Sequence, residues 1–324
     1  MRQLRRIGQT DIQVTPVAMG CWPITGITSI DVTRERSLET LQAAFDAGIN
    51  FFDTAYVYGY DGESERMIAQ ALGSHRNQIV IASKCGIEWS SDRKQKRDAR
   101  AETIFRQCEI SLQRLQTDYI DLYYLHAPDP QTPIEESAGA MASLLQQGKI
   151  RSVGVSNLSS IAQLEAFSSV CQISASQPHY NMLQREIEEE QLPWCRTRGV
   201  SVIPYWPLMK GFLAGKLPRD HQWQLEDGRQ KYPIFQGEEW TRNQDFLDKI
   251  RPIAHEAGMT LPQLAVAWVI QQSGITAALC GAKRPEQIQE TAAAMDNSLT
   301  ETHLSQIESA IRLRGAVNSR PAVV

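Results

Sequence analysis

Short apolar runs alternate with longer segments of helical periodicity along most of this chain. Eight of the short runs predict strands, and they span residues 17–19, 50–53, 79–83, 120–126, 152–156, 173–177, 200–205 and 277–281. Segments of helical periodicity lie between them, several of which end in glycine, and they include 37–48, 103–116, 134–148 and 261–274. Alternating strands and helices predict a parallel sheet. Eight such units predict an α/β fold of the (β/α)8 TIM-barrel type.

Two segments stand outside this alternation. Residues 4–14 predict an N-terminal hairpin whose turn lies at 8–11. Roughly fifty residues separate Leu208, just past the seventh strand, from the next helix. This insertion holds a polar stretch, 217–240, followed by a helical pattern from about residue 240 to residue 256. Insertions of this length in compact domains are commonly lids or binding loops, so we expect it to cover the mouth of the barrel.

Composition narrows the function classes. A chain of 324 residues with 42% hydrophobic content can bury a barrel-sized core, and no Gly/Ser/Pro linker divides it, so we expect one domain over residues 1–324. A net charge of −4 argues against nucleic-acid binding. No segment resembles a signal peptide or approaches the roughly 20 apolar residues of a membrane helix, which favours a cytoplasmic protein without a membrane partner. The six cysteines have no paired spacing, which argues against a metal or CxxC redox centre.

Four polar residues lie at or just past the carboxyl ends of three successive apolar runs: Asp53, Tyr58, Lys84 and His126. A barrel of parallel strands gathers its chemistry at that end. A buried ammonium at Lys84 needs a partner, and Asp53 is placed to provide one. The charged lysine is expected to lower the pKa of Tyr58 from about 10 toward the neutral range. His126 is expected to hydrogen-bond a substrate oxygen or to relay a proton.

These four groups suit delivery of a proton to a carbonyl oxygen while a separate agent adds hydride to the carbon. The chain has no hydride of its own, so a nicotinamide would have to supply it. The pattern Asp53-Thr54-Ala55-x-x-Tyr58-Gly59, followed by Lys84 and Leu125-His126, resembles the aldo-keto reductase superfamily over nearly the whole chain. The resemblance implies reversible reduction of an aldehyde or ketone to an alcohol, with Tyr58 as general acid assisted by Lys84 and His126.

The same resemblance implies a set of cofactor-binding positions. Those at the nicotinamide amide are Ser156, Asn157 and Gln177, with Asp53 and Trp22 close by and Tyr205 stacked on the ring. Those along the pyrophosphate are Trp206, where the family often has serine, and Pro207, Leu208, Gly211 and Lys216. Those at the adenosine end are Gly281, Lys283, Gln287 and Glu290. Lys283 or its neighbour Arg284 would bind a 2′-phosphate, which favours NADPH, with NADH possible.

Further positions concern the substrate. Trp22 is also a candidate wall of the substrate pocket, and Trp89 is a second one. A run of basic residues within 86–101 would attract an anionic substrate, although a solvated basic loop is the favoured interpretation. The partner implied is a small carbonyl compound. Its identity and the oligomeric state are left open.

Two other classes of protein compete with the reductase. One is a non-catalytic nicotinamide-binding regulatory subunit resembling the potassium-channel β-subunits of the superfamily. Those relatives typically lack the histidine found here at position 126, which favours an enzyme. The other is a Schiff-base aldolase with Lys84 as nucleophile. Such an enzyme has no use for the residues predicted to bind a nicotinamide.

Overall fold

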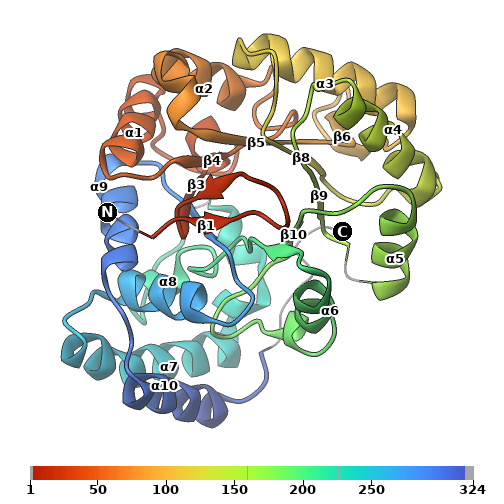
Figure 1. Ribbon diagram of the computed structural model, residues 1–324. Coiled ribbons are helices and arrows are strands. Elements are labelled where there is room, and N and C mark those ends of the chain that lie inside the picture. Colours follow the sequence, from red (N-terminus) through yellow and green to blue (C-terminus); the bar gives the residue numbers. More distant parts are fainter. Residues whose placement is uncertain (1–2, 159, 225–226, 318–324) are drawn as a thin grey trace.

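An eight-stranded parallel sheet forms the centre of the protein in the computed structural model, which describes residues 3–158, 160–224 and 227–317 (Figure 1). The strands are β3 (Val17–Gly20), β4 (Phe51–Asp53), β5 (Val80–Cys85), β8 (Leu122–Leu125), β9 (Val153–Ser156), β10 (Ala175–Gln177), β11 (Ser201–Val202) and β12 (Ala278–Gly281). Their order is β11-β10-β9-β8-β5-β4-β3-β12. Parallel bridges from Val202 to Ile275 and from Tyr205 to Leu279 join the two edges. The predicted barrel of eight parallel strands is therefore confirmed.

Side chains alternate between the two faces of each strand, as the β pleat requires. The inward-facing residues form an apolar cluster with three residues of the N-terminal hairpin, Ile7, Ile12 and Val14. The hairpin consists of β1 (Arg5–Arg6) and β2 (Gln13–Val14), and it lies across the barrel in Figure 1. It was predicted from the sequence. Because these side chains fill the amino-terminal end of the barrel, only the carboxyl end is left for chemistry.

Helices surround the barrel and pack on the outward faces of the strands (Figure 1). They are α1 (Arg34–Asp46), α2 (Glu63–Leu72), α3 (Ala101–Leu115), α4 (Ile134–Gln146), α5 (Ile161–Val170), α6 (Gln191–Arg198), α7 (Gly237–Glu256), α8 (Leu261–Gln271), α9 (Pro285–Ala292) and α10 (Glu301–Arg314). Neighbouring helices contact one another around the ring, from α8 through α9 and α1 to α5. Within the described part of the chain, the helices are too short or too polar to span a membrane.

The insertion after the seventh barrel strand divides into two parts. Its second half, α7, packs against α8 and α10 on the outside of the barrel. In the first half, Trp223 and Phe235 form an aromatic cluster with Trp240 of α7, with 5.3 Å between the ring centroids of the first two. Tyr232 reaches back to Trp206 at the strand ends, with 6.4 Å between ring centroids. The cover expected over the mouth is thus limited to the first half, whose residues 225 and 226 lie outside the described ranges.

A second hairpin follows β5 and was not predicted. It consists of β6 (Ile87–Trp89) and β7 (Gln95–Arg97), which pair antiparallel. Its turn contains Arg93 with a left-handed φ of 58°. The sequence favours a solvated basic loop over residues 86–101, and the structure has a hairpin there instead. The hairpin lies directly after the strand that carries Lys84, so its position bears on the site.

Candidate active site

On five barrel strands, the row of inward-facing side chains finishes in a polar residue at the carboxyl end of the barrel. Each lies two positions after an apolar residue of the interior, so strand alternation aims it into the barrel. The pairs that share a row are Phe51 and Asp53, Ala82 and Lys84, Tyr124 and His126, Ala175 and Gln177, and Ile203 and Tyr205. The strands therefore bring together five residues that the sequence analysis had singled out.

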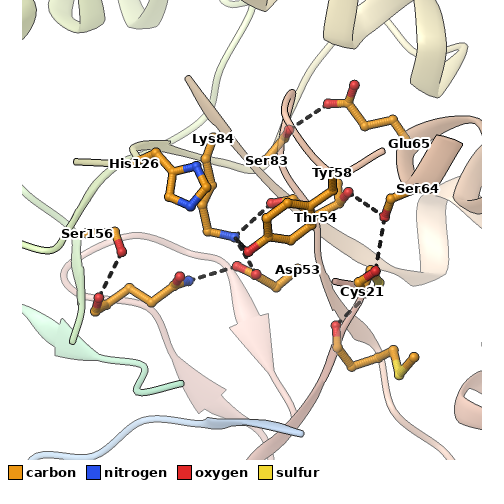
Figure 2. Close-up of polar contacts among 12 residues, drawn as sticks. Cys21, Asp53, Thr54, Tyr58, Ser64, Glu65, Ser83, Lys84, His126 and Ser156 are labelled. Atoms are coloured by element: carbon orange, nitrogen blue, oxygen red, sulfur yellow. Dashed lines mark hydrogen bonds and ion pairs between the residues drawn. The ribbon is translucent and has the colours of Figure 1, made fainter. Parts of the chain in front are cut away.

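Lys84 and Asp53 form a buried ion pair (Figure 2). The lysine Nζ lies 2.5 Å from Asp53 Oδ1 and also donates to the Thr54 carbonyl at 2.8 Å. The second carboxylate oxygen of Asp53 accepts a hydrogen bond from Gln177 Nε2 at 2.8 Å. Burial alone would lower the pKa of Lys84, but the Asp53 carboxylate raises it above its ordinary value. The amine is therefore charged at neutral pH, as the sequence analysis expected.

Tyr58 lies on the loop after β4, with its hydroxyl 3.3 Å from Lys84 Nζ. The expectation that its pKa is lowered is wrong. Burial raises the pKa of Tyr58 above 10, and the nearby Asp53 carboxylate adds to this, so the charge of Lys84 is outweighed. The sequence could not weigh burial against charge. The phenol is therefore protonated at neutral pH.

His126 and Trp22 flank the tyrosine ring. The Tyr58 centroid is 5.8 Å from that of His126 and 5.0 Å from that of Trp22, and both contacts are edge-on. Burial and the charge of Lys84 hold the pKa of His126 well below its usual range, so the imidazole is neutral. Its Nδ1 is buried without a hydrogen-bond partner among the described residues.

The residues predicted to bind a nicotinamide amide lie together beside His126. Ser156 Oγ donates to the Gln177 carbonyl at 2.9 Å, and Asn157 Nδ2 donates to the His126 carbonyl at 2.9 Å. The Tyr205 hydroxyl donates to Asn157 Oδ1 at 2.9 Å. This last bond fixes the orientation of the Tyr205 ring at its strand end. The ring is therefore held in place as a flat surface before any ligand binds.

The loop after Tyr205 has an unusual backbone. Four of its residues, Trp206, Met209, Lys210 and Gly211, have positive φ angles between 47° and 86°. For each of the three that are not glycine, this conformation costs on the order of 1 kcal/mol. The backbone N–H groups of Leu208 and Lys210 have no acceptor among the described residues. Successive amides in such a turn form a concave site for an anion, which fits a pyrophosphate.

Lys210 was missed by the sequence analysis, although it lies directly before Gly211. Its Nζ lies 3.7 Å from the Trp206 ring centroid and 4.1 Å from that of Tyr232. Burial lowers its pKa to about 7, and the charges of Lys231 and Arg229 contribute. Positive charges this close repel one another, and a bound anion would offset that repulsion and favour the protonated form of Lys210. This basic cluster therefore also fits a phosphate group.

The adenosine-end residues meet the loop residues. Lys216 Nζ pairs with Glu290 Oε2 at 2.8 Å, although the two residues are far apart in the sequence. The backbone N–H of Lys283 donates to Gln287 Oε1 at 3.0 Å, and its side-chain amine donates to the Ile30 carbonyl at 2.7 Å. The remaining predicted positions follow the same strand ends, with Pro207 and Leu208 after β11 and Gly281 at the end of β12. The predicted cofactor positions thus lie at the strand ends, in the loop after β11 and at the start of α9.

Comparison with known proteins gives related chains of matching length. The sequence model of the Aldo/keto reductase family matches residues 16–312. A relative from Escherichia coli (strain K12), named NADH-specific methylglyoxal reductase, is 34% identical over 91% of this chain and 94% of its own. A relative from Arabidopsis thaliana, named probable voltage-gated potassium channel subunit beta, is 33% identical over 96% and 97%. The structure of a glycerol dehydrogenase from Gluconobacter oxydans has a TM-score of 0.91 at 33% identity, over 99% of this chain and 98% of that one.

Proposed function

This chain belongs to the aldo/keto reductase family, and we propose that it reduces an aldehyde or ketone reversibly to an alcohol with Tyr58 as the acid. The family and the fold make it an NAD(P)H-dependent oxidoreductase. One observation carries the finer proposal. The charged amine of Lys84 contacts both a buried carboxylate and the hydroxyl of Tyr58, which is protonated at neutral pH.

The proposed roles follow from this geometry. A bound reduced nicotinamide would supply hydride to the carbonyl carbon. Tyr58 donates its proton to the developing alkoxide oxygen, and Lys84, 3.3 Å away, stabilises the phenolate that remains. Asp53 keeps the lysine charged and in place. His126 is neutral, and its ring lies edge-on to Tyr58, so we assign it to the orientation of the carbonyl oxygen beside Tyr58.

Other residues would hold the cofactor and the substrate. The ring of Tyr205 offers a stacking face, and Ser156, Asn157 and Gln177 lie at the amide end. The left-handed loop and the basic cluster at Lys210 suit the phosphates. Trp22 covers one edge of the Tyr58 ring and is proposed as a wall of the substrate pocket.

Turnover tests the proposal directly. Purified protein is mixed with NADPH or NADH and with aldehydes, ketones, sugars or pyridoxal, and the loss of reduced-nicotinamide absorbance is followed. We expect turnover with at least one carbonyl class. Inactivity with every substrate, together with retained cofactor binding, would favour a regulatory subunit instead. The Arabidopsis relative named a channel subunit is the observation that keeps this second function in view.

An aldolase is less consistent with the site. A Schiff-base nucleophile must be a neutral amine, whereas the charge of Asp53 holds Lys84 in its protonated form. Trapping of a substrate on Lys84 by borohydride would support the aldolase. A change in protein fluorescence on addition of NADPH would support the reductase.

We further propose NADPH as the preferred cofactor, because Lys283 lies at the end of β12 beside the start of α9. Replacing Lys283 with methionine is expected to weaken NADPH binding by about tenfold, the loss of one charged hydrogen bond, and to change NADH binding little. Fluorescence titration measures both dissociation constants. Lys249→Met on α7, which removes an exposed lysine, is the matched control. Equal losses for both cofactors would contradict a 2′-phosphate contact.

Affinity for NADPH should also depend on pH through Lys210, whose pKa is about 7. Below that pH the amine is charged and attracts phosphate. Above it, binding must restore the proton, so the affinity falls as pH rises, by at most about tenfold per pH unit. The 2′-phosphate, with a pKa of about 6, is mostly ionised above pH 7 and adds little slope there. Titrations at several pH values in Lys210→Met should show a flatter dependence, and an unchanged slope would exclude Lys210.

A further inference from the structure

The loop that carries Tyr58 is held through its backbone by side chains from outside the loop. Residues 54–62 connect β4 to α2 without regular secondary structure. On one side lies the hairpin β6–β7. The indole Nε1 of Trp89 donates to the carbonyls of Val57 and Gly59, at 3.0 and 2.9 Å. A single N–H group therefore fastens the residues immediately before and after Tyr58.

Arg114 of α3 holds the same loop from another direction. Its Nη1 donates to the carbonyl of Tyr56 at 3.0 Å, and its guanidinium lies 4.6 Å from the Tyr56 ring centroid. The guanidinium also packs on the backbone of Gly62, where a Cβ atom would lie 2.4 Å from it. Gly62 has a left-handed φ of 69°, so any other residue there would be strained as well as clashing. The arginine side chain and the loop backbone are thus in direct contact.

A buried carboxylate connects this arginine to the strand of Lys84. Glu65 is fully buried, and its Oε2 pairs with Arg114 Nη1 at 3.3 Å. Its Oε1 accepts a hydrogen bond from Ser83 Oγ at 2.7 Å, and Ser83 directly precedes Lys84 (Figure 2). The same charged pair therefore contacts the loop that carries the acid and the strand that carries its ammonium partner.

The hydrogen bond between Lys84 and Tyr58 depends on the exact position of the loop that carries the tyrosine. The hydrogen bond from Lys84 Nζ to Tyr58 Oη measures 3.3 Å, near the long end of the usual range. A shift of the loop by a fraction of an ångström breaks it. Neither the carbonyls at 56, 57 and 59 nor the buried pair takes part in the chemistry described above. Their common effect is on where Tyr58 lies relative to Lys84.

We propose that Trp89 and Arg114 are positioning residues for the acid: they clamp the backbone on either side of Tyr58 and so hold its hydroxyl against Lys84. The proposal rests on the function proposed for Tyr58. It assigns a role to the hairpin β6–β7 and to the buried Glu65–Arg114 pair. It also assigns Trp89 to the loop backbone instead of the substrate pocket.

Trp89→Phe tests the first half of the clamp, because it keeps an aromatic ring and removes the N–H group. We expect kcat to fall by about 10-fold to 100-fold, the effect of a small misplacement at a reacting centre, with the NADPH dissociation constant unchanged. Trp194→Phe is the matched control, since the Nε1 of Trp194 has no hydrogen-bond partner among the described residues. The loss should be equal for small and large carbonyl substrates. A loss that depends on substrate size would mean that Trp89 lines the pocket, and it would overturn its positioning role.

A test of Arg114 must not leave the buried carboxylate of Glu65 without its ion-pair partner. Arg114→Met alone leaves Glu65 unpaired, so the double variant Glu65→Leu with Arg114→Met is the one to assay. We expect it to remain folded by circular dichroism and to show a lower kcat. Arg114→Lys keeps the charge but cannot reach the same set of acceptors, and it should recover part of the rate. Full activity in the double variant would overturn the role of Arg114.

The pH profile provides a readout that a purely structural role would not move. Alcohol oxidation needs the ionised phenol, and Lys84 lowers the pKa of Tyr58 only while it stays close. In both clamp variants the ascending limb of the oxidation profile should therefore move to higher pH. An unmoved limb would contradict the positioning proposal. Normal activity in Tyr58→Phe would refute the proposed function. Normal activity in Trp89→Phe and in the Glu65→Leu, Arg114→Met double variant, together with loss of activity in Tyr58→Phe, would refute the positioning proposal alone.

Discussion

Replacing Tyr58 with phenylalanine is expected to lower kcat for carbonyl reduction by about 10² to 10⁴-fold, the usual contribution of general acid catalysis. The phenol is buried against Lys84 and is protonated at neutral pH, so a proton donor lies in direct contact with that ammonium. Phenylalanine keeps the ring contacts with Trp22 and His126. The pocket should therefore keep its shape and lose only the proton.

The measurement combines steady-state turnover with a fluorescence titration of NADPH. We expect the cofactor dissociation constant to stay near that of the unmodified protein, because Tyr58 is not one of the residues proposed to hold the cofactor. Tyr119→Phe is a suitable control. Tyr119 is half-buried before β8, and its ring would keep its contacts with Arg76 and Arg151. Turnover close to normal in Tyr58→Phe would refute the assignment of the acid.

Replacing Lys84 with methionine is expected to reduce both stability and activity. The substitution leaves the carboxylate of Asp53, which is 2% exposed, without its ammonium partner. Breaking a buried ion pair on one side typically costs about 3–5 kcal/mol of unfolding free energy. Activity should be lost as well, because the phenolate left after proton donation no longer has a positive charge beside it.

A double variant separates the two effects. With Asp53→Asn added to Lys84→Met, no buried charge is left unpaired, and the asparagine oxygen can still accept from Gln177. We expect urea denaturation to show recovery of most of the lost stability. Turnover should stay low, since the ammonium is still absent. A Lys84→Met protein as stable as the unmodified one would mean that the pair is not charged in the folded state.

The eight barrel strands could be predicted because each is a short apolar run closed off by turn residues. The hairpin β6–β7 could not. Its strands, Ile87–Trp89 and Gln95–Arg97, are only three residues long and the second is wholly polar, so neither shows a usable alternation. Contacts from outside the hairpin, such as the bonds from Trp89 to the Tyr58 loop, secure its position. Contacts between residues far apart in the chain produce no pattern in the local sequence.

The residues of the candidate site likewise divide into those that the sequence predicted and those that it did not. Asp53, Lys84 and His126 were found because residues at the ends of adjacent parallel strands must converge. Lys210 was missed because its partner Tyr232 comes from the insertion, more than twenty positions later. The direction of the Tyr58 pKa shift was predicted wrongly for a related reason. A neighbouring charge can be guessed from strand order, whereas the cost of burying a phenolate depends on everything that surrounds it.

The sequence by itself determined the order of the eight barrel strands and of the helices between them, the face each barrel strand turns inward, and therefore which polar residues meet at the barrel mouth. These follow from local periodicity, in which each residue's place depends on its near neighbours. Only the tertiary structure decided how the acid is held and what protonation state it has. Those properties depend on distances of a few tenths of an ångström and on exclusion of water, to which residues far apart in the chain contribute together.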